Sequence, residues 1–324
     1  MKYTKSEAKQ WARENMVGEW TTMVTPFTEK DELDEKGLAH NVEHVLSLGT
    51  KGLGFSWNMG EFWSLTAEER MRLMDLVPKL VRGRSLTAFQ CTDTCIKDVI
   101  AMCKKAEGLG IDLAILAAPY IMTKTEEQVI DFISRVANET NIGIAFYNSP
   151  QFGITMTPKG LLKLADIPNL VAIKEASFNM QFGIDTHLLV GKKAVISVPD
   201  EEIFFFEDYY GFHQQVMFAN TSDWRFDTPK SHNYVEFINL ATSGHLDKAK
   251  AIYPKIWPIK SLSRRWWSRL VVRTGGALPV QMVKYWGELL GMKAGHVRPP
   301  LYPLTKEEKD ELKQDLSKLM PIST

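Results

Sequence analysis

The sequence has little that would direct the chain to a membrane or to nucleic acid. No stretch reaches the roughly 18 consecutive apolar residues that a membrane-spanning helix requires. The amino terminus, MKYTKSEAKQWARENM, is polar and helical in character, without the apolar region of a secretory signal. Lysine plus arginine and aspartate plus glutamate both total 39, so the net charge is zero and no basic face for a phosphate backbone is indicated. We therefore expect a cytoplasmic protein with no membrane or nucleic-acid partner.

Several kinds of reactive site are missing as well. The 3 cysteines, Cys91, Cys95 and Cys103, are an odd number with no second cysteine pair or histidine cluster nearby, which predicts reduced thiols. The 7 histidines are scattered, and the chain has no His-Glu-x-x-His metal motif. It also has no Gly-x-Ser-x-Gly nucleophile elbow and no phosphate loop. The sequence thus predicts no metal and no bound cofactor.

The sequence does contain a regular alternation of short apolar runs and longer amphipathic ones. Hydrophobic residues make up 44% of the chain, which is enough for a sizeable core. The short runs are about 5 residues long and rich in Val, Ile, Leu, Phe and Ala, as expected of strands that are buried on both faces. The predicted strands are Trp20–Thr25, Gly52–Ser56, Leu86–Gln90, Leu113–Ala117, Gly143–Tyr147, Leu170–Lys174, Ala194–Val198 and Gln215–Ala219.

Helical patterns occupy the intervals between these runs. The predicted helices are Glu35–Leu48, one that begins at Thr66, Thr94–Leu109, Thr125–Asn138 and Thr157–Ala165. Thr66 and Glu69 form a capping box, and Pro158 stands in the first turn of its helix. The acidic run Asp200–Glu202, after the seventh strand, is predicted to cap the helix that follows. The alternative is that it holds a cation or a polar group of the substrate. Repeated strand–helix units are typical of parallel strands joined by crossover helices.

The number of units favours a (β/α)8 TIM barrel, an α/β fold of about 250 residues. The barrel is expected at residues 18–244, after an N-terminal helical segment at 1–17. Residues 245–324 are predicted to form a C-terminal helical extension, in which Gly291 and Arg298-Pro299-Pro300 separate the last two helices. The alternative is a doubly wound open sheet, which normally has a glycine-rich loop after its first strand. The stretch Thr25–Thr28 (TPFT) is not such a loop.

Two reactive side chains stand where a barrel places its catalytic groups, at the carboxyl ends of strands. Lys174 closes the apolar run Leu170–Ile173, where a charged ammonium is costly. Desolvation there can bring a lysine pKa from about 10.4 to about 7–8, which yields a neutral amine that attacks ketones. Tyr147 ends the preceding strand and could relay protons. The alternatives are a salt-bridged or mouth-exposed lysine, and a tyrosine whose hydroxyl binds a neighbouring backbone group.

Both residues lie within longer motifs, Tyr147–Pro150 (YNSP) and Val171–Ser177 (VAIKEAS). These motifs resemble the dihydrodipicolinate synthase/N-acetylneuraminate lyase family. Further matches, in order and with family spacing from about residue 18 to 305, are Gly60–Phe62, Leu65–Arg70, Ala118–Tyr120 and Gly295–Leu304. The resemblance implies a (β/α)8 barrel with a C-terminal helical segment, usually tetrameric, that works through a lysine Schiff base without metal.

By this resemblance, Lys174 is the Schiff-base lysine and Tyr147 is the proton relay. The family's Gly-Thr-Thr-Gly-Glu loop, which holds the carboxylate of pyruvate, corresponds here to Trp57–Glu61 (WNMGE). Asn58 and Met59 replace two hydroxyl residues, so the Asn58 amide and backbone N–H groups are expected to hold the carboxylate. The resemblance thus implies a 2-oxo acid of the pyruvate type and an aldehyde as small-molecule partners, and a homotetramer.

Two departures from the family disfavour lysine biosynthesis. Dihydrodipicolinate synthases have an arginine after the tyrosine motif that grips the second substrate's carboxylate, and here the stretch is Gln151–Gly153 (QFG). Their second tyrosine, which reaches across a subunit interface, is Ile121 here. The candidate substrate-binding residues are Trp57, Asn58, Met59, Gly60, Ile121 and Phe152.

These mostly apolar replacements favour the hydratase-aldolase branch, with reversible aldol cleavage that releases an aromatic or hydrophobic aldehyde. The stretch Gly60–Thr66 is also similar to sugar-acid dehydratases such as 5-dehydro-4-deoxyglucarate dehydratase. A dehydratase of a 2-keto-3-deoxy sugar acid is therefore the alternative. A non-catalytic binding barrel is a third reading, and the retention of both Tyr147 and Lys174 argues against it.

Overall fold

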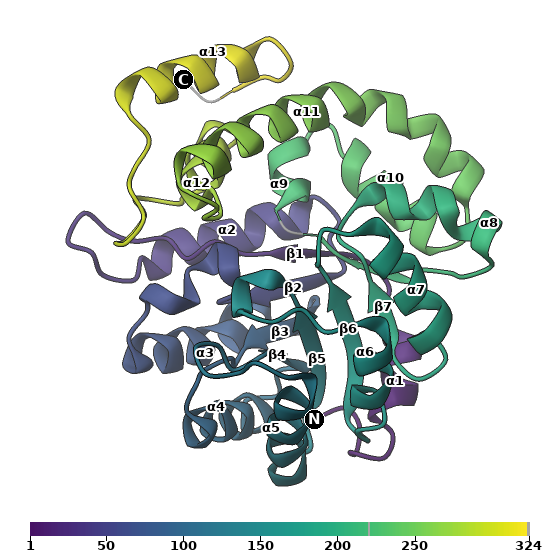
Figure 1. The fold of residues 1–324 in the computed structure, drawn as a ribbon. Helices are drawn as coiled ribbons and strands as arrows, with labels where there is room; N and C mark the ends of the chain where they lie inside the picture. Colours follow the sequence, from purple (N-terminus) through teal and green to yellow (C-terminus); the bar gives the residue numbers. More distant parts are fainter. Residues whose placement is uncertain (220, 323–324) are drawn as a thin grey trace.

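The computed structural model describes residues 1–219 and 221–322, and its centre is a parallel sheet rolled into a barrel (Figure 1). The 8 strands follow the order β7-β6-β5-β4-β3-β2-β1-β8. All the pairings along this order are parallel. The strands are β1 Gly18–Thr22, β2 Gly52–Phe55, β3 Leu86–Gln90, β4 Leu113–Ala117, β5 Gly143–Asn148, β6 Leu170–Glu175, β7 Val195–Ser197 and β8 Val216–Phe218. The predicted (β/α)8 barrel is confirmed.

The two outer strands of this order, β7 and β8, meet and close the ring. The Phe218 N–H of β8 donates a hydrogen bond to Ser197 Oγ of β7 at 2.8 Å. Every strand residue except Leu86 is buried. Burial on both faces explains why the strands appear in the sequence as continuous apolar runs and not as alternating ones.

Helices cover the outside of the barrel between successive strands (Figure 1). Their bounds are α2 Glu35–Ser47, α3 Ala67–Val81, α4 Ile96–Gly108, α5 Glu126–Glu139, α6 Pro158–Leu164, α7 Met180–Val190, α8 Glu207–Tyr210, α9 Ser222–Phe226 and α10 Asn233–Thr242. Short 3-10 helices follow several strands at the carboxyl end: η1 Asn58–Gly60, η2 Phe62–Ser64, η3 Pro150–Phe152 and η4 Glu201–Phe206. The capping box of Thr66 and Glu69 is present at the start of α3.

The first strand begins earlier in the chain than predicted. It spans Gly18–Thr22, whereas the apolar pattern predicted Trp20–Thr25. The ladder with β8 starts where Gly18, with φ of 74°, pairs with Val216. Glu19 is fully buried in this ladder, and a carboxylate is not expected in a strand interior, so the pattern placed the start too late.

The N-terminal segment, with α1 at Ala8–Asn15, packs against strand β6 and joins several loops of the barrel. The Tyr3 hydroxyl accepts a hydrogen bond from the Gly143 N–H at 2.8 Å, and its own proton goes to the Asp112 carbonyl at 2.5 Å. Lys9 Nζ donates to the Ala165 carbonyl at 2.5 Å. These bonds fasten the segment to the start of β5 and to the loops that precede β4 and β6.

The C-terminal extension is helical in its described residues, with α11 Leu246–Arg273, α12 Val280–Leu289 and α13 Lys306–Ser317, while residues 323–324 lie outside the description. Figure 1 shows α13 beside α11 and α12, away from the centre of the barrel. Ion pairs join α11 to α13: Arg265–Asp315 at 2.6 Å, Arg269–Glu311 at 2.6 Å and Arg273–Glu308 at 2.7 Å. No described helix is long and apolar enough to cross a bilayer.

Candidate active site

Lys174 and Tyr147 are neighbours across the ladder of β5 and β6. Their Cα atoms are register partners near the carboxyl ends of the two strands. The Lys174 Nζ lies 5.0 Å from the centre of the Tyr147 ring and 4.8 Å from the centre of the Trp57 ring. Only 2% of Lys174 is exposed. The structure therefore brings together the two side chains that were predicted from their positions at strand ends.

Burial changes the acidity of both groups, and for Lys174 the change is in the direction that imine formation needs. Desolvation lowers the pKa of Lys174 to about 7, because the buried site disfavours the ammonium form. Desolvation also raises the pKa of Tyr147 well above its usual range, and the Ser149 side chain opposes this rise. At neutral pH about half of the Lys174 side chains are thus neutral amines, while Tyr147 keeps its proton.

Trp57 forms the wall opposite Tyr147. Its ring packs edge-on against Phe218 with a centroid distance of 5.7 Å, and lies 6.4 Å from the Tyr147 ring. A Cβ atom at Gly54 would come within 2.7 Å of the Trp57 ring, so only glycine leaves room for the indole there. Ser56, just before Trp57, has φ of 58°, a left-handed conformation that is unusual for a side chain other than glycine.

The turn that carries Trp57 holds buried polar atoms with no hydrogen-bond partner among the described residues. These atoms are Ser56 Oγ, Trp57 Nε1 and Asn58 Oδ1. The Asn58 amide nitrogen, in contrast, donates to the side-chain oxygen of Gln151. Buried polar groups normally have partners, so unsatisfied atoms close to Lys174 are consistent with a site that receives a polar ligand or water.

The space beside Lys174 is narrow. Its volume is about 20 Å³, close to the room that one water molecule needs. It is lined by Thr22, Trp57, Asn58, Met59, Tyr147, Gln151, Lys174, Ala176, Phe178, Trp267 and Leu278. Five of the predicted site residues are thus in this lining: Lys174, Tyr147, Trp57, Asn58 and Met59.

The other predicted substrate-binding residues lie outside this lining. Phe152 is buried behind Tyr147, with 5.5 Å between the ring centres. Gly60 packs against the segment that follows β1, where its carbonyl accepts a hydrogen bond from Thr25 Oγ1 at 2.7 Å. Ile121 is 70% exposed and has φ of 77°, so its side chain points away from Lys174's pocket into solvent in the single chain. Phe152 and Gly60 therefore support the site from behind.

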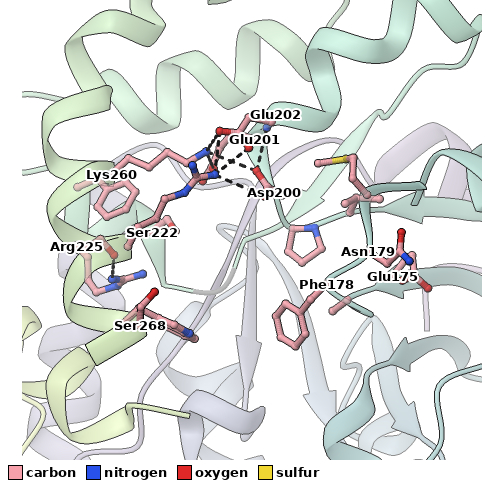
Figure 2. A pocket seen from close by; sticks show the side chains of 18 residues that line it. Glu175, Phe178, Asn179, Asp200, Glu201, Glu202, Ser222, Arg225, Lys260 and Ser268 are labelled. Carbon is pink, nitrogen blue, oxygen red and sulfur yellow. Dashed lines mark hydrogen bonds and ion pairs between the residues drawn. The ribbon is translucent and has the colours of Figure 1, made fainter. Parts of the chain in front are cut away.

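A second and larger cavity adjoins the first. It has a volume of about 570 Å³ and shares Ala176, Phe178 and Trp267 with the lining beside Lys174 (Figure 2). Its remaining wall comes from the loops after β6 and β7, from α9 and from α11. A molecule bound at Lys174 can therefore extend past these three shared residues into a space large enough for a second substrate.

The loop Trp57–Glu61 is fixed by a buried ion pair to the C-terminal extension. Lys284 of α12 lies 2.6 Å from Glu61, and both side chains are at most 1% exposed. The second Glu61 carboxylate oxygen accepts the Arg298 N–H at 3.1 Å. The Arg298 side chain in turn pairs with Glu69 at 2.7 Å. The predicted loop and the Gly295–Leu304 motif thus form one connected unit.

The described residues offer no alternative metal centre. No group of three or more His, Cys, Asp or Glu side chains in them is placed to hold a metal ion. All 3 cysteines are free thiols, and Cys91 and Cys103 are buried. The arrangement around Lys174 is suited to covalent chemistry on an amine.

A model of the Dihydrodipicolinate synthetase family matches residues 15–319 of the chain. The chain belongs to this family. It is accordingly a class I, Schiff-base lyase. The 4-hydroxy-tetrahydrodipicolinate synthase of Bacillus subtilis (strain 168) is 28% identical over 309 residues, which cover 92% of this chain and 98% of the relative. The synthase of Desulforudis audaxviator (strain MP104C) is 29% identical over 300 residues, with 90% and 94% covered.

Solved structures of family members have the same fold. A crystal structure of a dihydrodipicolinate synthase is 25% identical, with a TM-score of 0.78, and covers 94% of this chain and 99% of its own. The prophage protein YagE of E. coli K12, solved in complex with pyruvate, is 23% identical with a TM-score of 0.79, and covers 94% and 98%. At these identities the comparisons assign the family and leave the branch within it open.

Residues that the sequence analysis did not select complete the site of this family member. Gln151 was noted only as the replacement of an arginine, yet it holds Asn58 and lines the pocket. Trp267 and Leu278 come from the C-terminal extension and reach the pocket only through the fold. Phe178 follows the VAIKEAS motif and has φ of 63°, a conformation that no sequence pattern predicted.

Proposed function

We propose that the protein binds pyruvate as a Schiff base on Lys174 and carries out reversible aldol cleavage with an aromatic or hydrophobic aldehyde as the second partner. The observation that carries this proposal is the position of a buried amine with a pKa of about 7 beside Tyr147, at the edge of a larger cavity. Family membership supports the same chemistry.

In the proposed cycle the neutral Lys174 amine attacks C2 of pyruvate, and the carbinolamine loses water to form an iminium. The iminium withdraws electrons from C3, so a proton can leave C3 and an enamine forms. The enamine carbon then adds to the aldehyde carbonyl, whose oxygen takes up a proton. Tyr147 carries protons between these atoms. Water finally releases the product and restores the amine.

In the reverse direction the same groups cleave an aldol. The iminium of the bound 2-oxo acid accepts the electron pair of the breaking C3–C4 bond, and the aldehyde leaves. Where the substrate has a C3=C4 double bond conjugated with the iminium, water adds to it first, hydroxyl at C4 and proton at C3. The sequence of hydration and cleavage defines the hydratase-aldolase reaction.

We propose that the pyruvate carboxylate binds at the turn that contains Trp57, Asn58 and Met59. Two buried donors without a hydrogen-bond partner among the described residues, Ser56 Oγ and Trp57 Nε1, lie in this turn. Because the Asn58 amide nitrogen is engaged by Gln151, backbone N–H groups of the turn are the better donors to a carboxylate. The narrow space beside Lys174 disfavours a bulky 2-oxo acid and leaves the second partner to the larger cavity.

A dehydratase of a 2-keto-3-deoxy sugar acid is the second candidate, and the polar wall of the larger cavity favours it. Asp200, Glu202 and Lys260 line this wall and could bind the hydroxyl groups of a sugar acid. The same Lys174 iminium would acidify C3, so that the C3 proton and the C4 hydroxyl leave as water. Turnover of a deoxy-oxo sugar acid in preference to aldehydes with pyruvate would select this candidate.

The test is trapping of the Schiff base with borohydride. Wild-type protein incubated with pyruvate and borohydride should gain one reduced pyruvyl group by intact mass, and peptide mapping should locate it on Lys174. Lys174→Ala, shown to be folded by circular dichroism, should gain none. If a folded wild type traps none of several 2-oxo acids, the Schiff-base proposal fails and a non-catalytic barrel becomes the better description.

We also propose a homo-oligomer, by the family resemblance a tetramer. Ile121 and Met122 are 70% and 78% exposed in the single chain, and Ile121 adopts a left-handed backbone conformation that is unfavourable for a branched side chain. Two adjacent exposed apolar residues at the mouth of the barrel are suited to a subunit contact. Light scattering should give a mass above 36.9 kDa, and a monomer at all concentrations would refute the assembly.

A further inference from the structure

The larger cavity contains two different sets of charged residues. One set, in its upper wall in Figure 2, comprises Asp200, Glu201 and Glu202 with the cations that neutralise them. Lys260 Nζ lies 2.5 Å from Glu201 and 3.5 Å from both Asp200 and Glu202, and Arg264 lies 2.8 Å from Glu202. The positive charges of Lys260 and Arg264 are thus already used within the wall.

The cavity is also lined by Glu175, which accepts hydrogen bonds from the Asn148 amide nitrogen and the Ser177 N–H, and by Arg225, which has no ion-pair partner among the described residues. Its side chain is 3% exposed, and no described carboxylate lies within ion-pair distance of it. Nε donates to Thr221 Oγ1 at 2.8 Å and to the Thr221 carbonyl at 3.2 Å, and Nη1 donates to Ser263 Oγ at 2.7 Å. No hydrogen bond to a described residue starts from Nη2.

The surroundings of Arg225 make its charge expensive without an anion. The guanidinium carbon lies over three aromatic rings, at 5.2 Å from Phe226, 5.8 Å from Trp267 and 5.8 Å from Trp286. Burial lowers the pKa of Arg225 to about 10, which still leaves it charged at neutral pH. The nearby carboxylates of Asp223 and Glu201 lie beyond ion-pair distance of Arg225, and a buried cation in this situation is stabilised when an anion binds next to it.

Hydroxyl groups that could assist an anion lie beside Arg225. Ser222 and Ser268 line the same cavity, and Figure 2 shows both on the side of the cavity where Arg225 lies. Ser263 Oγ accepts its hydrogen bond from Arg225, so its own proton remains available to donate. Trp267 links this corner to the pocket of Lys174, because it lines both spaces.

We propose that Arg225, with the neighbouring serine hydroxyls, binds a carboxylate on the far end of the second substrate, so that the aldehyde partner is an aromatic aldehyde acid. This assignment rests on the proposed Schiff-base function and deepens it. The aldehyde carbon faces Lys174, the ring lies between Phe178 and Trp267, and the carboxylate reaches Nη2 of Arg225. The arginine that is missing after the tyrosine motif is thereby replaced from a different element, α9.

The experiment compares the carboxybenzaldehydes with the carbamoylbenzaldehydes of the same substitution, which have nearly the same shape and no charge. Each is condensed with pyruvate, and kcat/KM for the aldehyde is measured. Wild-type protein should favour at least one carboxylate isomer over its amide by about 10- to 100-fold, as expected for a hydrogen-bonded charge pair in a buried site. This comparison does not depend on the folding of any variant.

Variants of Arg225 and Arg264 then test which residue causes the preference for the carboxylate. Arg225→Gln should bring the ratio of kcat/KM for the carboxylate to kcat/KM for the amide close to 1, and Arg225→Lys should retain part of the preference because the charge remains. Arg264→Gln is the matched control, since Arg264 lines the same cavity but is paired with Glu202, and it should keep the carboxylate preference. Circular dichroism verifies that each variant is folded.

The outcomes separate the two proposals. If the wild type traps pyruvate with borohydride but treats both aldehydes alike, or if Arg225→Gln keeps the preference, the assignment of Arg225 is wrong and the Schiff-base function stands. If Arg264→Gln loses the preference instead, the anion binds at the ion-pair wall and the assignment is likewise overturned. If no 2-oxo acid is trapped, both proposals fall together.

Discussion

At the scale of single residues, the reactivity of Lys174 depends on the exclusion of water from its surroundings. The rings of Trp57 and Tyr147, at 4.8 and 5.0 Å from Nζ, occupy space that water would take around an exposed lysine. The faces of the aromatic rings attract the ammonium form, but this attraction replaces only part of the stabilisation that water would give it. Desolvation therefore remains the dominant influence on the pKa.

This environment predicts a pH dependence for imine formation. Below a pKa of about 7 Lys174 is an ammonium without a free electron pair, and above it the amine is neutral, so the trapping rate with pyruvate should rise between about pH 6 and 8 and then level off. The rate of adduct formation is measured by intact mass on quenched samples across this range. A rate that continues to rise towards pH 10 would mean that Lys174 has the pKa of an exposed lysine.

Trp57 sets the volume next to the reactive amine, which is about 20 Å³. Trp57→Ala removes the indole above Gly54, and we expect this variant to trap larger 2-oxo acids such as phenylpyruvate, which the wild type traps poorly. The lost packing should cost about 3–5 kcal/mol of stability. Trp224→Phe is the control, because Trp224 is buried outside this lining and should not widen the substrate range. An unchanged range in Trp57→Ala would show that Trp57 does not limit the pocket.

At the scale of elements, the loop next to Lys174 is held by helix α12 of the C-terminal extension. Burial lowers the pKa of Lys284, and its ion pair with Glu61 opposes that change. A buried pair of this kind contributes most to positioning, since the loss of one partner leaves the other charge without compensation. The pair thus connects the geometry of the loop to the docking of the extension.

Glu61→Gln tests this connection. We expect it to lower the free energy of unfolding by about 3–5 kcal/mol, because Lys284 would remain buried without a carboxylate, and to weaken pyruvate trapping. Urea unfolding followed by circular dichroism gives the first quantity. Glu35→Gln is the control, because Glu35 forms an exposed pair with Arg72 at 2.7 Å and its loss should cost at most about 1 kcal/mol. An equal loss of unfolding free energy in Glu61→Gln and Glu35→Gln would contradict the role of the buried pair.

The elements also show what the sequence could and could not predict. Lys174 and Tyr147 were predictable, since each ends an apolar strand and the parallel ladder must then place them side by side. Gln151, Trp267 and Leu278 were not, because loops and distant helices deliver them to the pocket only after tertiary packing. Glu19 was missed for another reason, namely that a carboxylate in a strand interior contradicts the apolar pattern from which strands are predicted.

At the scale of the whole molecule, a group of buried carboxylates lies between the barrel and its helical layer. Glu19 of β1, Asp223 of α9 and Asp227 after α9 are all at 0% exposure. Burial raises the pKa of each, to about 6 for Asp223 and about 7 for Asp227, and the mutual repulsion of the carboxylates adds to the effect at Glu19. The folded state therefore holds protons that the unfolded state releases near pH 4.

Because these three carboxyl groups hold protons in the folded state that they release in the unfolded state, their contribution to stability should fall as the pH rises from about 4 to about 7. Asp223→Asn keeps a partner for the hydroxyls of Thr21 and Thr50 but cannot ionise, so it should reduce this loss and raise the Tm at pH 8 by about 3 °C. Scanning calorimetry at several pH values measures the Tm of each protein. Asp131→Asn is the control, because Asp131 lies at an exposed site on α5. It should change neither the pH dependence of stability nor the Tm at pH 8. A Tm difference between Asp223→Asn and the wild type that does not grow with pH would contradict the role of the carboxylates.

The contact between Glu61 and Arg298 spans 237 residues of the chain. During synthesis, which proceeds from the amino terminus, Lys174 and the loop at residue 57 leave the ribosome long before residue 298 does. A nascent chain can therefore pair most of its barrel strands while the loop beside the amine is still unfastened. The loop is therefore locked only after translation has reached residue 298, so an unfinished chain lacks the contact that fixes its amine pocket.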